Sequence, residues 1–361
     1  MYYVRIDNGN GEQILYSPIA VNDGFVILEP KLKSELNKAL SFTFLLPPTN
    51  PHYNDISKLK TIITVYDDTE LVFRGRCREA TKSFNNCIDV ECESDLAFLG
   101  DVDTDKYDAS KTASGWIDYF LGLYNDIAPT EREITKGTVR SISSFALSND
   151  SESNVLDELL EITNKKGGML RTRVDNGSVK LDYLAIESSP AQDAQVIRFG
   201  KNLIDFEQFI DASDIITRVK AYGKETTENN VTTVVGPVTV TNTNAETLFG
   251  TRVLRIVKFS EAENTTDLTS FATAYLNKNV SMSITIKLSA VDLHLLDVNE
   301  KKLEVGKRNR IISAAHGFDE SYVCSRIELD LADPSKNTYE FGDKRYTLTE
   351  KVTYNTPVLR R

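Results

Sequence analysis

The sequence predicts a mainly β protein, α+β overall, with two antiparallel β-barrel domains, an α+β insertion domain and a further, smaller β/α excursion. Three observations lead to this prediction. Strand-like runs fill the first hundred residues, helical spacing appears only after Asp101, and strand-like runs return from Phe199. At about 100–200 residues per domain, the 361 residues are enough for two to four domains.

The first β-barrel domain is predicted at residues 1–102. About seven short runs rich in β-branched and aromatic residues support it, at 2–6, 14–16, 25–28, 41–45, 61–66, 71–76 and 87–92. Asn8-Gly9 favours a tight hairpin turn, and Pro47-Pro48 ends a strand. Val72 and Phe73 are expected in a barrel strand, with Gly75 relieving crowding at its turn or bulge.

An α+β domain is predicted at residues 103–200. Trp116, Phe120 and Leu123 recur at helical spacing, and we expect Trp116 in the core. A second helix, capped by Ser153 or Asn154, is expected to end at Gly167-Gly168, followed by a hairpin that turns at residues 175–178.

The second β-barrel domain is predicted at residues 201–226 and 296–348, interrupted by an inserted β/α domain at 227–295. Residues 215–219 are expected to form a central strand of this barrel. Residues 224–250 indicate extended hairpins or a loop, and a third helix is expected to open at Thr266 or Asp267. Residues 349–361 are assigned to a C-terminal tail.

Composition excludes several function classes. The net charge of −11 gives no electrostatic reason for tight nucleic-acid binding. No apolar run is long enough for a membrane anchor, and the first residues lack a secretory signal, so we expect synthesis and folding in the cytoplasm. The four cysteines are expected to be reduced and mostly buried, although a Cys77–Cys87 pair on successive strands is conceivable.

No motif indicates catalysis, a cofactor or a metal. The histidines His52, His294 and His316 lack the spacing of hydrolytic or metal-binding motifs. Residues 101–106 resemble the start of a calcium loop but lack its turn glycine, so a solvated linker is favoured. The basic residues at 301–310 are interpreted as a solvated hairpin, in preference to a phosphate site. We therefore predict no catalytic, cofactor-binding or metal-binding residues, and no enzyme.

A family resemblance adds to this interpretation. The stretches that carry it are residues 72–76, 199–204, 211–219, 222–223, 290–293, 303–306, 326–336 and 341–342. In their order and spacing they resemble the prophage tail proteins that form the hub of siphophage baseplates, also described as the N-terminal region of tail-associated lysins. That family is similar to the central baseplate hub of contractile-tailed phages.

The resemblance implies a viral structural protein of the virion tail tip, assembled in the bacterial host cytoplasm. It implies a homotrimer whose six barrels match a sixfold tail tube. The implied partners are the distal tail ring, tail tube or tape-measure proteins, and receptor-binding or lytic tip proteins involved in host-cell attachment. Longer members continue into a lytic or receptor-binding domain, whereas this chain stops at Arg361, so lytic activity is not carried over.

Two alternatives stay open at this point. One is a peptidoglycan hydrolase of the tail tip with acidic catalysts in the α+β domain. The other is a carbohydrate- or receptor-binding module that uses polar loops such as 226–250.

Overall fold

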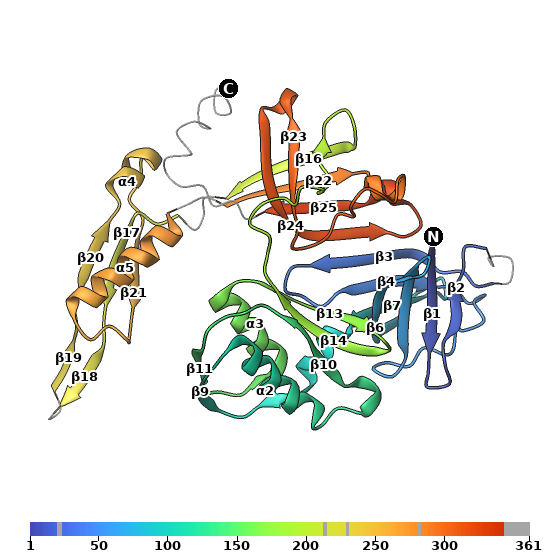
Figure 1. Cartoon of the computed structure of the whole chain (residues 1–361), viewed down its shortest axis with the longest axis horizontal. Coiled ribbons are helices and arrows are strands. Elements are labelled where there is room, and N and C mark those ends of the chain that lie inside the picture. Colours follow the sequence, from blue (N-terminus) through green and yellow to red (C-terminus); the bar gives the residue numbers. More distant parts are fainter. Residues whose placement is uncertain (20–23, 212–214, 229–230, 281–282, 343–361) are drawn as a thin grey trace. The chain divides into compact units, whose positions relative to one another are not determined.

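The computed structural model describes residues 1–19, 24–211, 215–228, 231–280 and 283–342 (Figure 1). These residues form two compact units. Unit 1 combines Met1–Phe206 with Leu288–Phe341, and unit 2 is built on Glu207–Lys287.

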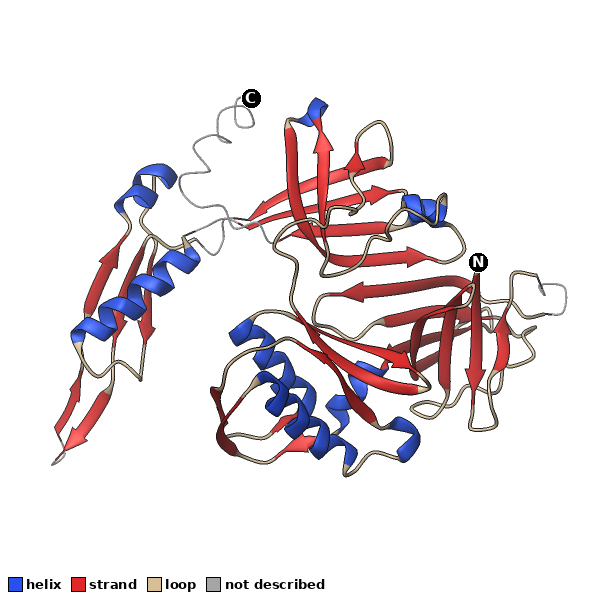
Figure 2. Cartoon of the chain, viewed as in Figure 1, coloured by secondary structure: helices blue, strands red, loops and turns tan. Residues whose placement is uncertain are grey.

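Unit 1 contains a large, mostly antiparallel sheet that curls on itself (Figure 2). Its first half has the order β3-β4-β7-β6-β5-β1-β2. The bounds are β1 Tyr2–Asp7, β2 Gln13–Tyr16, β3 Leu28–Glu35, β4 Ser41–Leu46, β5 Ile62–Asp67, β6 Glu70–Lys82 and β7 Ile88–Ser94.

The second half of this sheet has the order β16-β22-β25-β24, with β23 paired to β24 and β15 parallel to β23. The bounds are β15 Ile197–Arg198, β16 Leu203–Asp211, β22 Ser283–Ala290, β23 Arg308–Ser313, β24 Phe318–Asp330 and β25 Thr338–Gly342. Short 3-10 turns lie between these strands, namely η4 Leu293–Leu295, η5 Ala314–His316 and η6 Pro334–Lys336.

Strand β24 joins the two halves. Its first part pairs with β23, and its last five residues pair antiparallel with β3, from Arg326 opposite Glu35 to Asp330 opposite Lys31. The mainly β class predicted from the sequence is therefore confirmed, and the two predicted barrels share one continuous sheet among the described residues. The predicted domain boundaries stay a prediction.

Buried and partly exposed side chains alternate along the strands of the first half, so its inner face is apolar. Strand β4 buries every second residue, and its Phe42 and Phe44 rings pack 5.2 Å apart with Phe73 of β6 beside Phe42. The strand predicted at residues 25–28 is displaced in the structure to β3. Apolar residues suggested the earlier position, whereas β3 buries only Pro30 and Leu32 between charged residues.

The α+β part of unit 1 follows the predicted pattern closely. Helix α2 (Ala113–Asn125) begins after Thr112, and α3 (Val155–Lys166) is capped by Asn154 and ends at Gly167 with φ of 69°. Trp116 is fully buried, as predicted, and donates from its Nε1 to the Phe145 carbonyl at 3.2 Å.

A three-stranded sheet β10-β14-β13 packs with these helices. Strands β13 (Met169–Asp175) and β14 (Ser178–Leu184) turn through Asn176 and Gly177, which both have positive φ. The remaining elements of this part are α1 Asp95–Phe98, η2 Leu99–Asp101, β8 Asp103–Thr104, β9 Tyr107–Lys111, η3 Thr130–Arg132, β10 Ile134–Val139, β11 Phe145–Asn149 and β12 Ser153–Asn154.

Unit 2 is a small α/β sheet of order β20-β17-β21 with α5 packed on it. Its elements are β17 Arg218–Tyr222, β18 Glu225–Glu228, β19 Val231–Val234, β20 Val238–Thr241, α4 Thr243–Phe249, β21 Leu254–Lys258 and α5 Thr265–Asn279. Val219 and Ala221 of β17 pack against Leu268 and Ala272 of α5. We expected residues 215–219 to form a central strand of the second barrel. The strand observed there, β17, begins only at Arg218 and is the central strand of this small sheet, where α5 covers its apolar residues.

The chain enters and leaves unit 2 through neighbouring strands. Strand β16 leads out of the large sheet, β22 returns to it, and the two strands lie side by side in that sheet. Helix α4 lies within the region that the sequence predicted as hairpins or loop, and its N-cap is Asn242.

Gly75 in β6 tests the packing of the large sheet. A Cβ at this position would lie 2.1 Å from the Glu93 carbonyl oxygen of β7, which is backbone and cannot move aside, and 2.8 Å from the ring of Phe73. We expect Gly75→Ala to lower the free energy of unfolding by about 2–3 kcal/mol, measured by urea denaturation.

Gly122 provides the matched control, because a Cβ there meets nothing within 4 Å and the residue lies in α2. Gly122→Ala should raise stability by about 0.5–1 kcal/mol. Equal stabilities of the two variants would contradict this account of the sheet.

Candidate functional site: a groove lined by paired charges

Unit 1 contains a groove of about 400 Å³. Three parts of the chain line it: the turn after β3 (residues 34–38), the start of β13 (residues 169–173) and the segment 302–305 that precedes β23. Tyr2 and Tyr339 add aromatic walls, and burial raises the pKa of both phenols, that of Tyr2 to about 12 with Asp67, Asp292 and Glu70 adding to the shift. Both tyrosines are therefore neutral at physiological pH.

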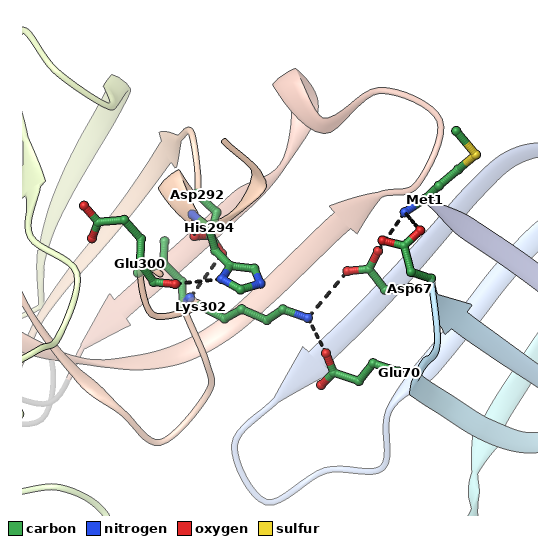
Figure 3. Close-up of polar contacts among 9 residues, drawn as sticks. Met1, Asp67, Glu70, Asp292, His294, Glu300 and Lys302 are labelled. Carbon is green, nitrogen blue, oxygen red and sulfur yellow. Dashed lines mark hydrogen bonds and ion pairs between the residues drawn. The ribbon is translucent and has the colours of Figure 1, made fainter. Parts of the chain in front are cut away.

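Lys302 crosses from the segment before β23 to the turn between β5 and β6 (Figure 3). Its Nζ lies 2.5 Å from Glu70 Oε2 and 3.5 Å from Asp67 Oδ2. Partial burial alone would lower the pKa of Lys302, but the hydrogen bonds and charges of Glu70 and Asp67 outweigh it and raise this pKa. The lysine is thus a cation held by the first half of the sheet.

Asp67 also binds the amino group of Met1. The Met1 nitrogen lies 3.1 Å from Asp67 Oδ1 and 2.9 Å from Asp68 Oδ1 (Figure 3). Asp67 consequently links a cation from each half of the large sheet. The Met1 amino group and the Lys302 ammonium group are thus both paired with carboxylates.

Beneath this ion-pair cluster, the buried carboxylate of Asp292 organises the segment 292–303. It accepts hydrogen bonds from Gln195 Nε2 at 2.8 Å, the His294 amide at 3.0 Å and the Leu303 amide at 3.1 Å. The segment has only one 3-10 turn, so its amides need side-chain acceptors when buried. Asp292 supplies them.

Gln195 extends the network to two further parts of the chain. Its Nε2 also donates to the Lys301 carbonyl at 2.9 Å, its Oε1 accepts from Asn202 Nδ2 at 3.3 Å, and its carbonyl accepts from Asn309 Nδ2 at 3.0 Å. Three stretches that carried the family resemblance, around Asn202, Asp292 and Leu303, therefore meet at this network. Their role here is structural.

Two further cations of the groove wall are paired with carboxylates. Arg173 Nε lies 2.9 Å from Asp182 Oδ2, and Lys38 Nζ lies 2.5 Å from Glu35 Oε1. Both pairs are local, within one turn and one hairpin, and carboxylates neutralised in this way are poor candidates for proton transfer.

The three histidines have local partners. His52 Nδ1 is 2.8 Å from Asp55 Oδ2, His294 Nδ1 is 2.6 Å from the Glu300 carbonyl, and His316 Nδ1 is 2.6 Å from Ser313 Oγ. The Ser313–His316 contact resembles a nucleophile–base pair, but Ser313 is 1% exposed and lines neither groove found in unit 1. A substrate has no access to this hydroxyl.

Asp95 is a buried carboxylate whose pKa is raised. Burial raises its pKa to about 6, against the opposing effects of Arg74, which hydrogen-bonds to it, and of Arg132. Such a pKa suits a general acid. However, Asp95 is 3% exposed and absent from the groove walls, so its role is structural.

The charged stretches noted in the sequence are also paired. Lys307 binds Glu187 at 2.9 Å, and Arg310 forms two hydrogen bonds of 2.6 Å with Asp319. Asp101 pairs with the buried guanidinium of Arg76, and residues 103–104 form β8, so residues 101–106 are part of the fold and not a linker. Within the described ranges, no group of three or more His, Cys, Asp and Glu residues is arranged to hold a metal ion.

The four cysteines are buried and free, and the conceivable Cys77–Cys87 pair does not occur. In the register of β6 and β7, Cys77 lies opposite Cys92, while Cys87 precedes β7. A bulge between Cys77 and Glu79 shifts this register by one residue. None of the helices in the described part of the chain has the length and apolar character required to span a membrane.

Comparison with solved structures shows the class of fold. A 43 kDa tail protein of prophage MuSo2 from Shewanella oneidensis matches with a TM-score of 0.63 at 12% identity, over 95% of this chain and 98% of that one. The tail protein from Neisseria meningitidis matches with 0.62 at 15%, over 94% and 95%. Prophage tail protein gp18 from Listeria monocytogenes matches with 0.58 at 13%, over 97% of each chain. The chain has the fold of these phage tail proteins.

A family model matches the sequence of the second half of the chain. Residues 191–352 match the model of the prophage endopeptidase tail family. The resemblance to prophage tail proteins is therefore confirmed. A comparison with curated proteins finds no match.

Asp292 tests the polar network. Asp292→Ala leaves the amides of His294 and Leu303 and the amide group of Gln195 without their acceptor, so we expect the free energy of unfolding to fall by about 3 kcal/mol in urea denaturation. Asp297→Ala is the control, because Asp297 Oδ1 accepts only within its own turn, from Asn299. A loss below about 0.5 kcal/mol is expected there. Similar losses in both variants would argue against the network.

The raised pKa of Asp95 predicts that the stability of the protein depends on pH. This pKa is about 6 in the folded protein against 3.8 for an exposed aspartate, so between these values the folded state binds more protons. Stability due to this group therefore falls as the pH rises from about 4 to 7, by at most about 3 kcal/mol. Relative to wild type, Asp95→Asn should gain stability over this range, measured by urea denaturation at each pH. Parallel curves would contradict the burial-driven shift.

Proposed function

We propose that this chain is a structural hub of a phage tail tip. Three copies would close a ring that joins the tail tube and the distal tail ring to the tip. The observation that carries the proposal is the likeness to three phage tail proteins over 94–97% of the chain, together with the family match in residues 191–352. The curled sheet with two connected halves supports a ring of six similar modules.

The paired charges of the groove support a non-enzymatic role. Lys302, Asp292 and their partners stabilise contacts between distant parts of the chain and leave no open acid–base pair. The site in this proposal is thus a structural junction between distant parts of unit 1.

A second candidate is a peptidoglycan hydrolase, since the matching family is described as an endopeptidase tail. The α+β part offers Glu158 and Asp182 as buried acids. Glu158 accepts from Asn149 Nδ2 at 2.6 Å and also from the Tyr107 hydroxyl, and Asp182 accepts from the Thr138 amide at 2.7 Å and from Arg173. Fixed partners of this kind favour a structural role for both.

The mass of the assembled protein tests the hub. Native mass spectrometry and light scattering of the purified full chain should give three times the mass of one chain, and mixing with the distal tail protein of the same phage should give a larger co-migrating complex. A monomer that ignores the distal tail ring at micromolar concentration would overturn the proposal.

A cell-wall digestion assay separates the second candidate. The hub predicts no release of soluble peptide or sugar from purified peptidoglycan. If release is observed, Glu158→Gln and Asp182→Asn identify whether the α+β acids cause it. Activity that persists in both variants would place the catalyst elsewhere.

A further inference from the structure

The cysteines Cys77 and Cys92 form an unassigned pair in the core of the first half of the sheet. Cys77 lies in the long strand β6 and Cys92 lies directly opposite it in β7. Both side chains are fully buried in the same hydrophobic cluster as Phe42 and Phe73, so they point to the same face of the sheet. The two sulfur atoms therefore share one small volume.

The backbone hydrogen bonds define the type of this pair. The Cys77 amide donates to the Thr61 carbonyl at 3.0 Å, and the Cys77 carbonyl accepts from the Leu59 amide at 2.7 Å. Both backbone groups of Cys77 thus point away from β7, which makes Cys77 and Cys92 a non-hydrogen-bonded antiparallel pair. Such pairs have Cα atoms roughly 4.5 Å apart, within the range of disulfides.

The Cys77 thiol donates to the Glu79 carbonyl at 3.5 Å. A hydrogen bond that Cys92 can donate to the Cys77 thiolate lowers the pKa of Cys77, whereas burial raises the pKa of Cys92. Cys77 is therefore the thiol that ionises first.

We propose that Cys77 and Cys92 are a latent disulfide that closes when the protein meets a small-molecule disulfide as oxidant. The Cys77 thiolate attacks one sulfur of the oxidant, forms a mixed disulfide and releases one thiolate. The Cys92 thiolate then attacks the Cys77 sulfur and releases the second thiolate. Two electrons pass from the cysteines to the oxidant, and the two thiol protons pass to the released thiolates.

Burial sets the rate of this reaction. An oxidant reaches the pair only when β6 and β7 separate locally, and the bulge between Cys77 and Glu79 is the irregular point of that pairing. The pair therefore stays reduced during synthesis and oxidises slowly afterwards. Exposure to an oxidising environment follows only if the protein is part of a virion that leaves the cytoplasm, and this step rests on the proposed function. The chemistry of the cysteine pair is independent of that function.

The experiment treats the purified full chain with oxidised glutathione, then blocks free thiols with a maleimide in denaturant and maps peptides by mass spectrometry. We expect a Cys77–Cys92 cross-link, with Cys87 and Cys324 blocked by maleimide. The cross-link should form several-fold faster in sub-denaturing urea, and the oxidised protein should unfold at a higher urea concentration than the reduced protein.

Two variants complete the test. Cys92→Ala should lose both the cross-link and the shift in the unfolding midpoint, whereas Cys87→Ala keeps both, since Cys87 lies outside the pair. Four blocked cysteines after prolonged oxidation of folded protein, a Cys77–Cys87 cross-link, or a cross-link that forms only in fully unfolded protein would each overturn the proposal. The mass of the assembly tests the hub separately.

Discussion

The pairing of β3 with β24 is the constraint on which unit 1 depends. Five residue pairs, from Glu35 with Arg326 to Lys31 with Asp330, join segments from opposite ends of the chain. Because backbone groups in a sheet have to be paired, this ladder fixes the position of the second half against the first. The groove and the Lys302 cluster then form within unit 1, where the turn after β3 lies near the segment before β23. Loss of the ladder would remove both.

Local signals account for what the sequence predicted well. Asn154 and Gly167 mark the ends of α3, and Asn176-Gly177 marks the hairpin of β13 and β14, since capping and positive φ are properties of a few neighbouring residues. The position of β3 could not be predicted in the same way. Its buried residues are Pro30 and Leu32, and the charged residues around them, Glu29, Lys31 and Lys33, mask the alternation in the sequence.

The contacts of the Asp292 network could not be predicted from the sequence for a different reason. Gln195, Asn202, Asp292 and Leu303 meet although about 100 residues separate the first from the last two. The family resemblance pointed to three of these positions without indicating that they touch. The cysteine pair shows the same limit, because a bulge places Cys92 instead of Glu93 opposite Cys77, and a bulge leaves no simple sequence pattern.

The entry and exit of unit 2 have a consequence for how such chains diversify. Since β16 and β22 are adjacent strands, the residues between them begin and end at nearly the same place in the large sheet. Evolution can lengthen, shorten or exchange that excursion without altering the strand order of its host. The same property makes it a natural graft point for a reporter or an affinity module in an engineered particle.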